Sequence, residues 1–229
     1  MPPNRIKIVH SFHELVSTPF GDGINALCWK RELKGDFKEV VEKLAGRDGI
    51  TTIEDEQLLN LPLSDAGKAA VEILIEDQRL LREHGLEPQL DCIDGYLRDA
   101  EPGPVPTDVY SFHADSATVE TDTYLCTYFG PSSEGIDNEE VQRKVDIPEI
   151  RSALLQRYGG EDDAEFIEWL HDHCFDLHYS PLPTAQPYVF GVGNLWRVAV
   201  EYAGCPVPPC IHRAPETLPG QPPRLLLIS

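Results

Sequence analysis

Apolar positions in the first part of the chain recur with helical spacing in two segments. In residues 35–46, GDFKEVVEKLAG, four apolar side chains fall on one face and a glycine closes the segment. A longer helix is predicted over 64–84, with Ser64 as its N-cap and Gly85 as its stop. Both helices are amphipathic, so each is expected to pack one face against a core.

The spacing changes after the proline-rich stretch 101–108, EPGPVPTD, which interrupts helical order. Residues 107–115 and 121–129 alternate with β-branched and aromatic side chains and predict two strands joined by a short connection. The segment 188–200, YVFGVGNLWRVAV, is strand-like with glycine bends. The final apolar run 224–228, RLLLI, predicts a last strand.

Between these strands the chain is predicted to turn helical again. Asp146 is expected to cap the helix in IPEIRSALLQRYG, and the acidic residues 161–163 lie at the positive end of the helix in EDDAEFIEWLHDHC. Helices come first, and strands interrupted by a helical insertion follow. This order predicts a single domain of the α+β class, 1–229, with a mostly antiparallel sheet and mainly helical support in 1–105.

The charge balance narrows the classes of partner. Asp and Glu number 39 against 19 Lys and Arg, so the formal net charge is -20. Such a field repels phosphate backbones and anionic lipid, which argues against nucleic acid and membrane as partners. Solubility or adaptation to salt explains this acidity, and a cationic substrate or partner is the functional alternative. The oligomeric state is not encoded in any recognisable pattern.

The compartment is predicted from the N-terminus and the cysteines. MPPNRIKIVHSF has no apolar signal-peptide core, and no apolar run has the length of a membrane span, so a cytoplasmic protein is expected. The cysteines lack CxxC spacing and are interpreted as reduced core thiols, although Cys205 and Cys210 in CPVPPC could approach each other. The six are Cys28, Cys92, Cys126, Cys174, Cys205 and Cys210.

The stretch YSFHADS, residues 110–116, contains the first candidate chemistry. Because side chains two apart in a strand share a face, His113 and Asp115 can converge on one ion. That arrangement suits one arm of a site with two histidines and one carboxylate, which leaves positions open for a cosubstrate and oxygen. The structural alternative is a histidine at a strand end followed by an aspartate that caps a turn.

The remaining histidines differ in their promise as a third ligand. His171 and His173 lie in a predicted helix, where residues two apart diverge by about 200° and cannot chelate one ion together. His212 is different, because Cys210–Arg213 predicts a short strand far enough along the chain to belong to another part of a barrel. Ordinary roles are expected for the others, which lie in a loop, near the terminus or at a helix end: His178, His10, His13 and His84.

Arg224 opens the last predicted strand, one proline-rich connection after His212. A guanidinium beside the distal histidine can clamp a dicarboxylate through two parallel hydrogen bonds while the keto-acid end of that molecule chelates a metal. No acidic residue stands next to it in QPPRLLLIS. Arg224 is therefore a candidate carboxylate anchor.

The order of HxD, distal His and then Arg resembles the Fe(II)- and 2-oxoglutarate-dependent oxygenases with a double-stranded β-helix. More narrowly, FHAD, YLCTYFGP, IHRAP and RLLLIS, within 109–229, resemble a bacterial family called domain of unknown function 1826. The resemblance implies Fe(II) ligands and catalytic residues at His113, Asp115 and His212. It also implies 2-oxoglutarate binding by Arg224 and Tyr124. Leu226 departs from the Arg-x-Ser pattern of some of these oxygenases.

The resemblance also implies a fold and an activity. The fold would be a jelly-roll or cupin-like barrel in 106–229, with a helical insertion at 131–187 that forms a lid or part of the barrel wall. The activity would be oxidation of a small-molecule substrate, as hydroxylation or desaturation, coupled to decarboxylation of 2-oxoglutarate. Two alternatives stay open: a cupin-like metal-binding protein that uses the same triad without 2-oxoglutarate, and an interaction protein without a metal.

Overall fold

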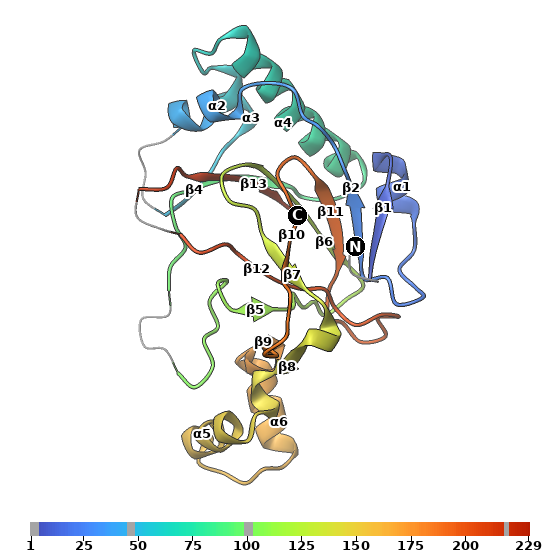
Figure 1. The fold of residues 1–229 in the computed structure, drawn as a ribbon, viewed down its shortest axis with the longest axis vertical. Helices are drawn as coiled ribbons and strands as arrows, with labels where there is room; N and C mark the ends of the chain where they lie inside the picture. Colours follow the sequence, from blue (N-terminus) through green and yellow to red (C-terminus); the bar gives the residue numbers. More distant parts are fainter. Residues whose placement is uncertain (1–4, 45–48, 99–102, 218–219) are drawn as a thin grey trace.

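Two antiparallel-rich sheets and a set of helices make up a mixed α+β fold (Figure 1). The computed structural model describes residues 5–44, 49–98, 103–217 and 220–229. One sheet is curled as a half-barrel, and the arrangement is compatible with a β-sandwich. The α+β class expected from the element order is confirmed at this level.

The larger sheet has seven strands in the order β1-β2-β11-β6-β13-β4-β3. Neighbouring strands pair antiparallel except β1 and β2, which are parallel. The strands are β1 (Ile6–Val9), β2 (Ala26–Trp29), β3 (Ile50–Thr52), β4 (Gln89–Ile93), β6 (Asp122–Phe129), β11 (Leu195–Ala199) and β13 (Arg224–Ile228). The strands expected from 121–129 and 224–228 are thus both present.

The smaller sheet has six short strands in the order β10-β7-β12-β5-β9-β8, all paired antiparallel. They are β5 (Phe112–His113), β7 (Glu134–Ile136), β8 (Val141–Arg143), β9 (His178–Pro181), β10 (Tyr188–Val189) and β12 (Ile211–Arg213). The two central strands, β12 and β5, carry two of the candidate ligands. Their position in the middle of the sheet fixes those side chains on a paired backbone.

Helices α1 (Phe12–Ser17), α2 (Phe37–Leu44), α3 (Asp55–Leu59) and α4 (Asp65–Glu83) pack against one face of the larger sheet (Figure 1). The Ser64 hydroxyl accepts a hydrogen bond from the amide of Gly67, and Gly85 has φ +84°, so both ends of α4 form as predicted. The predicted helix stop at Gly46 lies outside the described residues. This layer leaves the opposite face of the sheet for the second sheet.

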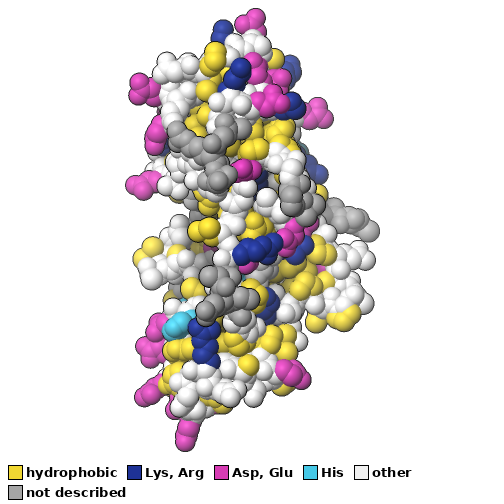
Figure 2. Space-filling view, turned by 90° about the vertical axis from the view of Figure 1, so that its left-hand side faces the viewer, with side chains coloured by type: hydrophobic (Ala, Val, Ile, Leu, Met, Phe, Trp, Pro, Cys, Tyr) yellow, Lys and Arg dark blue, Asp and Glu magenta, His cyan; other side chains and the backbone are white. Residues whose placement is uncertain are grey.

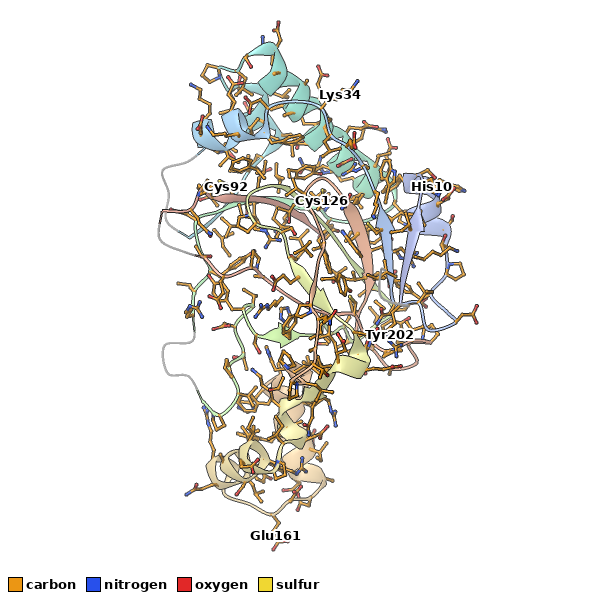
Figure 3. All side chains as sticks on the ribbon, viewed as in Figure 1. His10, Lys34, Cys92, Cys126, Glu161 and Tyr202 are labelled. Atoms are coloured by element: carbon orange, nitrogen blue, oxygen red, sulfur yellow. The ribbon has the colours of Figure 1, made fainter. Side chains whose placement is uncertain are left out.

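Alternation along β6 separates two cores. Tyr124, Cys126 and Tyr128 point into the helix-covered core, whereas Leu125 belongs to the cluster between the sheets. Figure 3 labels Cys126 and Cys92, which both lie on the helix side of the larger sheet. Because each face is buried against different elements, a side chain on this strand belongs to the site only when its position has the right parity.

The segment 131–187 contributes both strands and helices. Its strands β7 and β9 flank β12 and β5 in the smaller sheet. Its helices α5 (Pro148–Tyr158) and α6 (Ala164–Asp172) lie at the lower end of the view in Figure 1, around a separate small core. Three short 3-10 turns connect these elements, at Asn138–Glu140, Lys144–Asp146 and Phe175–Leu177. The segment therefore forms part of the wall beside the candidate ligands.

Two local expectations are wrong. The strand expected over 107–115 is only β5, because Asp108 forms a turn in which its carboxylate and its carbonyl accept from the amides of Tyr110 and Ser111. Asp146 does not cap α5, since its carboxylate is held by Arg143 at 2.9 and 3.2 Å. The helix instead begins with a proline in its first turn, which needs no partner for the missing N–H.

All six cysteines are free, and four of them are buried, as expected for reduced core thiols. No disulfide joins Cys205 to Cys210. Among the helices of the described residues, none combines the length and the apolar character needed to cross a membrane.

Candidate metal centre

His113 and His212 are direct partners across the β5–β12 ladder. Residues opposite each other in an antiparallel pair point to the same face, so both imidazoles project into the space between the sheets. Their ring centroids lie 4.8 Å apart. Asp115 follows β5 by two residues, and its main chain is fixed by a 2.7 Å hydrogen bond from the Glu201 amide to its carbonyl. Strand pairing thus brings His212 next to His113 and Asp115, which lie about a hundred residues earlier in the chain.

The three side chains converge on one point. One ligand atom from each of His113, Asp115 and His212 can be chosen so that all three lie within 4.8 Å of one another. Nε2 of His113 is 3.8 Å from Oδ1 of Asp115, and Nε2 of His212 is 3.8 Å from Oδ2. These distances are too long for hydrogen bonds. The group predicted from the sequence can therefore hold a metal ion.

The hydrogen bonds of the imidazoles favour this role. Nδ1 of His113 lies 2.7 Å from the carbonyl oxygen of Ser111, and Nδ1 of His212 lies 3.3 Å from that of Cys210. A carbonyl only accepts, so each Nδ1 carries the proton and donates. In the neutral form of such a ring, the lone pair is then on Nε2, the atom that faces Asp115.

The protonation states are those that metal binding requires. Burial, together with the charge of His212, lowers the pKa of His113 to about 4, so this ring is neutral at pH 7. Burial alone would raise the pKa of Asp115, but the nearby His212 and a 2.7 Å hydrogen bond from the Thr123 hydroxyl lower it. Asp115 is therefore a carboxylate, and Thr123 fixes its orientation.

Arg224 is buried in the same cavity, with 4% of its surface exposed. Its Nη1 donates to the Tyr96 hydroxyl at 3.0 Å, and its Nη2 donates to the hydroxyls of Thr127 and Ser133 at 2.9 and 2.6 Å. Its Nε, also buried, has no hydrogen-bond partner among the residues that the structure describes. Burial lowers the pKa of the guanidinium. Within the described residues, this cation has no carboxylate in ion-pair contact.

A cavity of about 170 Å³ joins the triad to Arg224. This volume is below the roughly 300 Å³ at which pockets for drug-sized ligands begin, so the cavity suits a small acid rather than a large substrate. Its remaining wall is mostly apolar. The wall residues are Asp91, Ile93, Tyr96, Val109, Leu125, Ser133, Ala214, Leu226 and Ile228.

Tyr124, expected as a second contact to 2-oxoglutarate, is not brought to this cavity. It lies in the core between the larger sheet and the helices, where burial raises its pKa to about 12. The physical reason is the parity of β6, on which Thr123 and Thr127 share the site face and Tyr124 faces the other way. Thr123, and not Tyr124, therefore contacts the site, through its hydrogen bond to Asp115.

The other histidines lie away from the triad, with one exception. His171 and His173 are exposed at the end of α6, and their Nδ1 atoms contact Asp176 at 3.2 Å and the Trp169 carbonyl at 2.8 Å. His10 lies beside α1 (Figure 3). The group of described residues that could hold a metal consists of His113, Asp115 and His212.

His178 is the exception, because it was expected in a loop. It begins β9 directly opposite His113, is buried, and has its ring centroid 5.8 Å from that of His113. Three histidines therefore stand side by side on β9, β5 and β12. The alternation in LHYSP, residues 177–181, was the available signal for a strand, but the sequence contains nothing that specifies its pairing with β5.

Comparisons of this chain with models of protein families, with curated proteins and with solved structures found no match.

Proposed function

We propose that the protein is an Fe(II)- and 2-oxoglutarate-dependent oxygenase that hydroxylates or desaturates a small molecule. One observation carries the proposal: the buried guanidinium of Arg224 lies in the same cavity as His113, Asp115 and His212, and its hydrogen-bond partners among the described residues are hydroxyl groups. Desolvating a cation without a counter-ion is costly. A ligand that presents a carboxylate to Arg224 and two oxygens to a metal ion would satisfy both ends of the cavity.

The donor set fits iron. Two imidazoles and one carboxylate, with open positions beside them, are the ligands typical of non-haem Fe(II) oxygenases. Hydrogen bonds fix the tautomers of both rings and the direction of Asp115. The two-sheet arrangement supports a double-stranded β-helix as part of this proposal. We likewise propose, from the resemblance of its motifs, that the chain is related to the family called domain of unknown function 1826.

The protein's residues have separate tasks in this scheme. Fe(II), if bound by the triad together with 2-oxoglutarate, would supply the capacity to oxidise a C–H bond with O2, while 2-oxoglutarate is converted to succinate and CO2. Arg224 binds the distal carboxylate of the cosubstrate, and Ser133 and Thr127 hold the guanidinium in position. Leu125 and Leu226 line the cavity and exclude water from it. The net charge of -20 disfavours nucleic acid, which leaves a small molecule as the substrate class.

A cupin-like metal-binding protein is the second candidate, and a specific observation favours it. Tyr124 faces the helices, and Leu226 lines the cavity where some oxygenases of this kind have a serine. Of the two residues predicted to bind 2-oxoglutarate, Arg224 lines the cavity and Tyr124 does not. A protein that binds metal through the triad alone would need neither a contact from Tyr124 nor a serine at position 226.

An anaerobic titration separates the two candidates. Purified protein loaded with Fe(II) is titrated with 2-oxoglutarate, and the weak visible charge-transfer band of a keto acid chelated to iron is recorded. The oxygenase proposal predicts a saturable band that does not develop when succinate, which lacks the keto group, replaces 2-oxoglutarate. Stoichiometric Fe(II) binding without any band would favour the cupin-like candidate. Failure to bind metal would contradict both.

A further inference from the structure

A second cavity, of about 330 Å³, lies beside the metal centre. It is formed by described residues of the β4–β5 connection, by Lys144 at the start of a 3-10 turn, and by Glu216. The residues from the connection are Arg98, Pro106, Asp108, Tyr110 and Ser111. Figure 2 shows the side of the molecule on which the β4–β5 connection lies, where Lys and Arg side chains stand next to acidic ones near the middle of the face. The cavity is about twice the volume of the one that contains Arg224.

Most charges that line this cavity already have partners. Arg98 forms an ion pair with Glu216, and its guanidinium lies over the ring of Tyr110, 4.1 Å from the centroid. The carboxylate of Asp108 accepts a hydrogen bond from the Tyr110 amide at 3.1 Å. These contacts shape the cavity walls, and Arg98 and Glu216 compensate each other's charge.

Lys144 differs from these residues. Its side chain is half-buried, and its Nζ donates to the Ser111 hydroxyl at 2.7 Å. Across the described part of the chain, no carboxylate lies within ion-pair distance of this ammonium group. A lysine ammonium has three N–H donors, and one neutral hydroxyl uses only one of them. Burial lowers the pKa of Lys144, and the more distant Asp108 partly opposes this effect.

Two sets of contacts connect this cavity to the metal centre. Ser111, which binds Lys144 through its hydroxyl, accepts the hydrogen bond from Nδ1 of His113 through its carbonyl. Tyr110 packs edge-on against Tyr96, with ring centroids 5.8 Å apart, and Tyr96 in turn binds Arg224. A ligand held at Lys144 would therefore lie beside Ser111, the residue that also accepts a hydrogen bond from the candidate metal ligand His113.

We propose that this cavity binds the anionic group of the primary substrate, a carboxylate or a phosphate, at the ammonium of Lys144. The negative field of the whole molecule repels anions, so an anionic substrate needs a local cation without an acidic partner. Among the described residues Lys144 is such a cation, and the cavity beside it has room for a small organic molecule. Calling the ligand the substrate rests on the proposed oxygenase function; the binding of an anion does not.

The test uses the full-length, ¹⁵N-labelled protein as purified, titrated with benzoate and separately with inorganic phosphate while amide shifts are followed by NMR. We expect saturable shifts at Tyr110, Ser111 and Lys144 with at least one of the two anions, and the active probe identifies the group. Neutral benzamide should give no such shifts. Loss of a charge-assisted hydrogen bond in Lys144→Gln should weaken binding roughly tenfold or more, and Lys144→Arg should retain it.

Two controls locate the effect. Lys68→Gln removes an exposed lysine on α4 and should leave anion binding unchanged. Arg224→Leu tests the other cavity and should also leave it unchanged, so failure of the oxygenase proposal would not remove this signal. Equal binding by wild type and Lys144→Gln, shifts that disappear only in Arg224→Leu, or no binding of either anion would overturn the proposal.

Discussion

Arg224 donates a hydrogen bond from Nη2 to the hydroxyl of Ser133 at 2.6 Å, although both side chains are buried. A buried guanidinium is usually neutralised by a carboxylate, and here its hydrogen-bond partners are neutral hydroxyls. Hydroxyls orient the cation without cancelling its charge. Because Ser133 orients Arg224 without neutralising it, the guanidinium can attract an anion into the cavity that contains His113 and His212.

Replacing Arg224 tests this attraction. Arg224→Leu should weaken 2-oxoglutarate binding to the Fe(II)-loaded protein by roughly thirtyfold or more, because a buried charge pair of this kind contributes about 2–5 kcal/mol. Fe(II) binding should persist, since the arginine is not a ligand. Arg213→Leu is the matched control. This arginine pairs with Glu134 and lies over the ring of Phe112, on the face of the smaller sheet opposite to His113 and His212. Unchanged affinity in Arg224→Leu would remove this residue from the site.

The contrast between Thr123 and Tyr124 shows what the sequence could not specify. The alternating pattern predicted the strand 121–129 correctly, but it did not indicate which face meets the second sheet. Both faces of β6 are buried, so hydrophobicity does not distinguish them. The structure resolves this through the 2.7 Å hydrogen bond from Thr123 to Asp115.

His113, Asp115 and His212 were predictable for a different reason. Two of them follow the period of a strand, and the third lies in a short segment whose strand character is local. The pairing of β5 with β9, which brings His178 next to His113, depends on contacts across 65 residues of chain that include two helices. Local patterns carry no information on such a register.

The triad itself is tested by removing one ligand at a time. His113→Ala and His212→Ala should each abolish retention of stoichiometric Fe(II) after anaerobic loading and desalting, because two remaining ligands hold an ion weakly. His171→Ala and His173→Ala should retain the metal, since both side chains are exposed at the end of α6. The metal content is measured by elemental analysis. Equal losses in all four variants would contradict the assignment.

Thr123→Val probes the group that orients the carboxylate. Valine keeps the shape of the side chain but removes the hydrogen bond to Oδ2 of Asp115. Outer hydrogen bonds to metal ligands typically affect affinity by about 10- to 100-fold, so we expect a loss of metal affinity in that range. Competition with a chromophoric chelator measures it. Thr121→Val, at an exposed position just before β6, should have the metal affinity of wild type. An unchanged metal affinity in Thr123→Val would exclude an orienting role for Thr123.

The last prediction concerns the stability of the metal-free protein at low pH. Burial and the neighbouring His212 hold the pKa of His113 at about 4, below the ordinary value of 6.5. The unfolded chain therefore binds a proton at this residue before the folded protein does. This group should leave the free energy of unfolding unchanged above about pH 6.5. As the pH falls from there toward 4, it should lower the free energy of unfolding, so the protein becomes less stable.

The magnitude follows from the size of the shift. A difference of about 2.5 pKa units corresponds to roughly 3 kcal/mol once the pH has reached the folded-state value. In His113→Asn the amide nitrogen can still donate to the Ser111 carbonyl, but no group titrates at this position. Urea unfolding in the presence of a chelator should show that wild type loses about 3 kcal/mol more than His113→Asn between about pH 7.5 and pH 4. His84→Asn, at an exposed helix end, should behave like wild type, and equal losses in His113→Asn and wild type would mean that His113 is not held neutral by its surroundings.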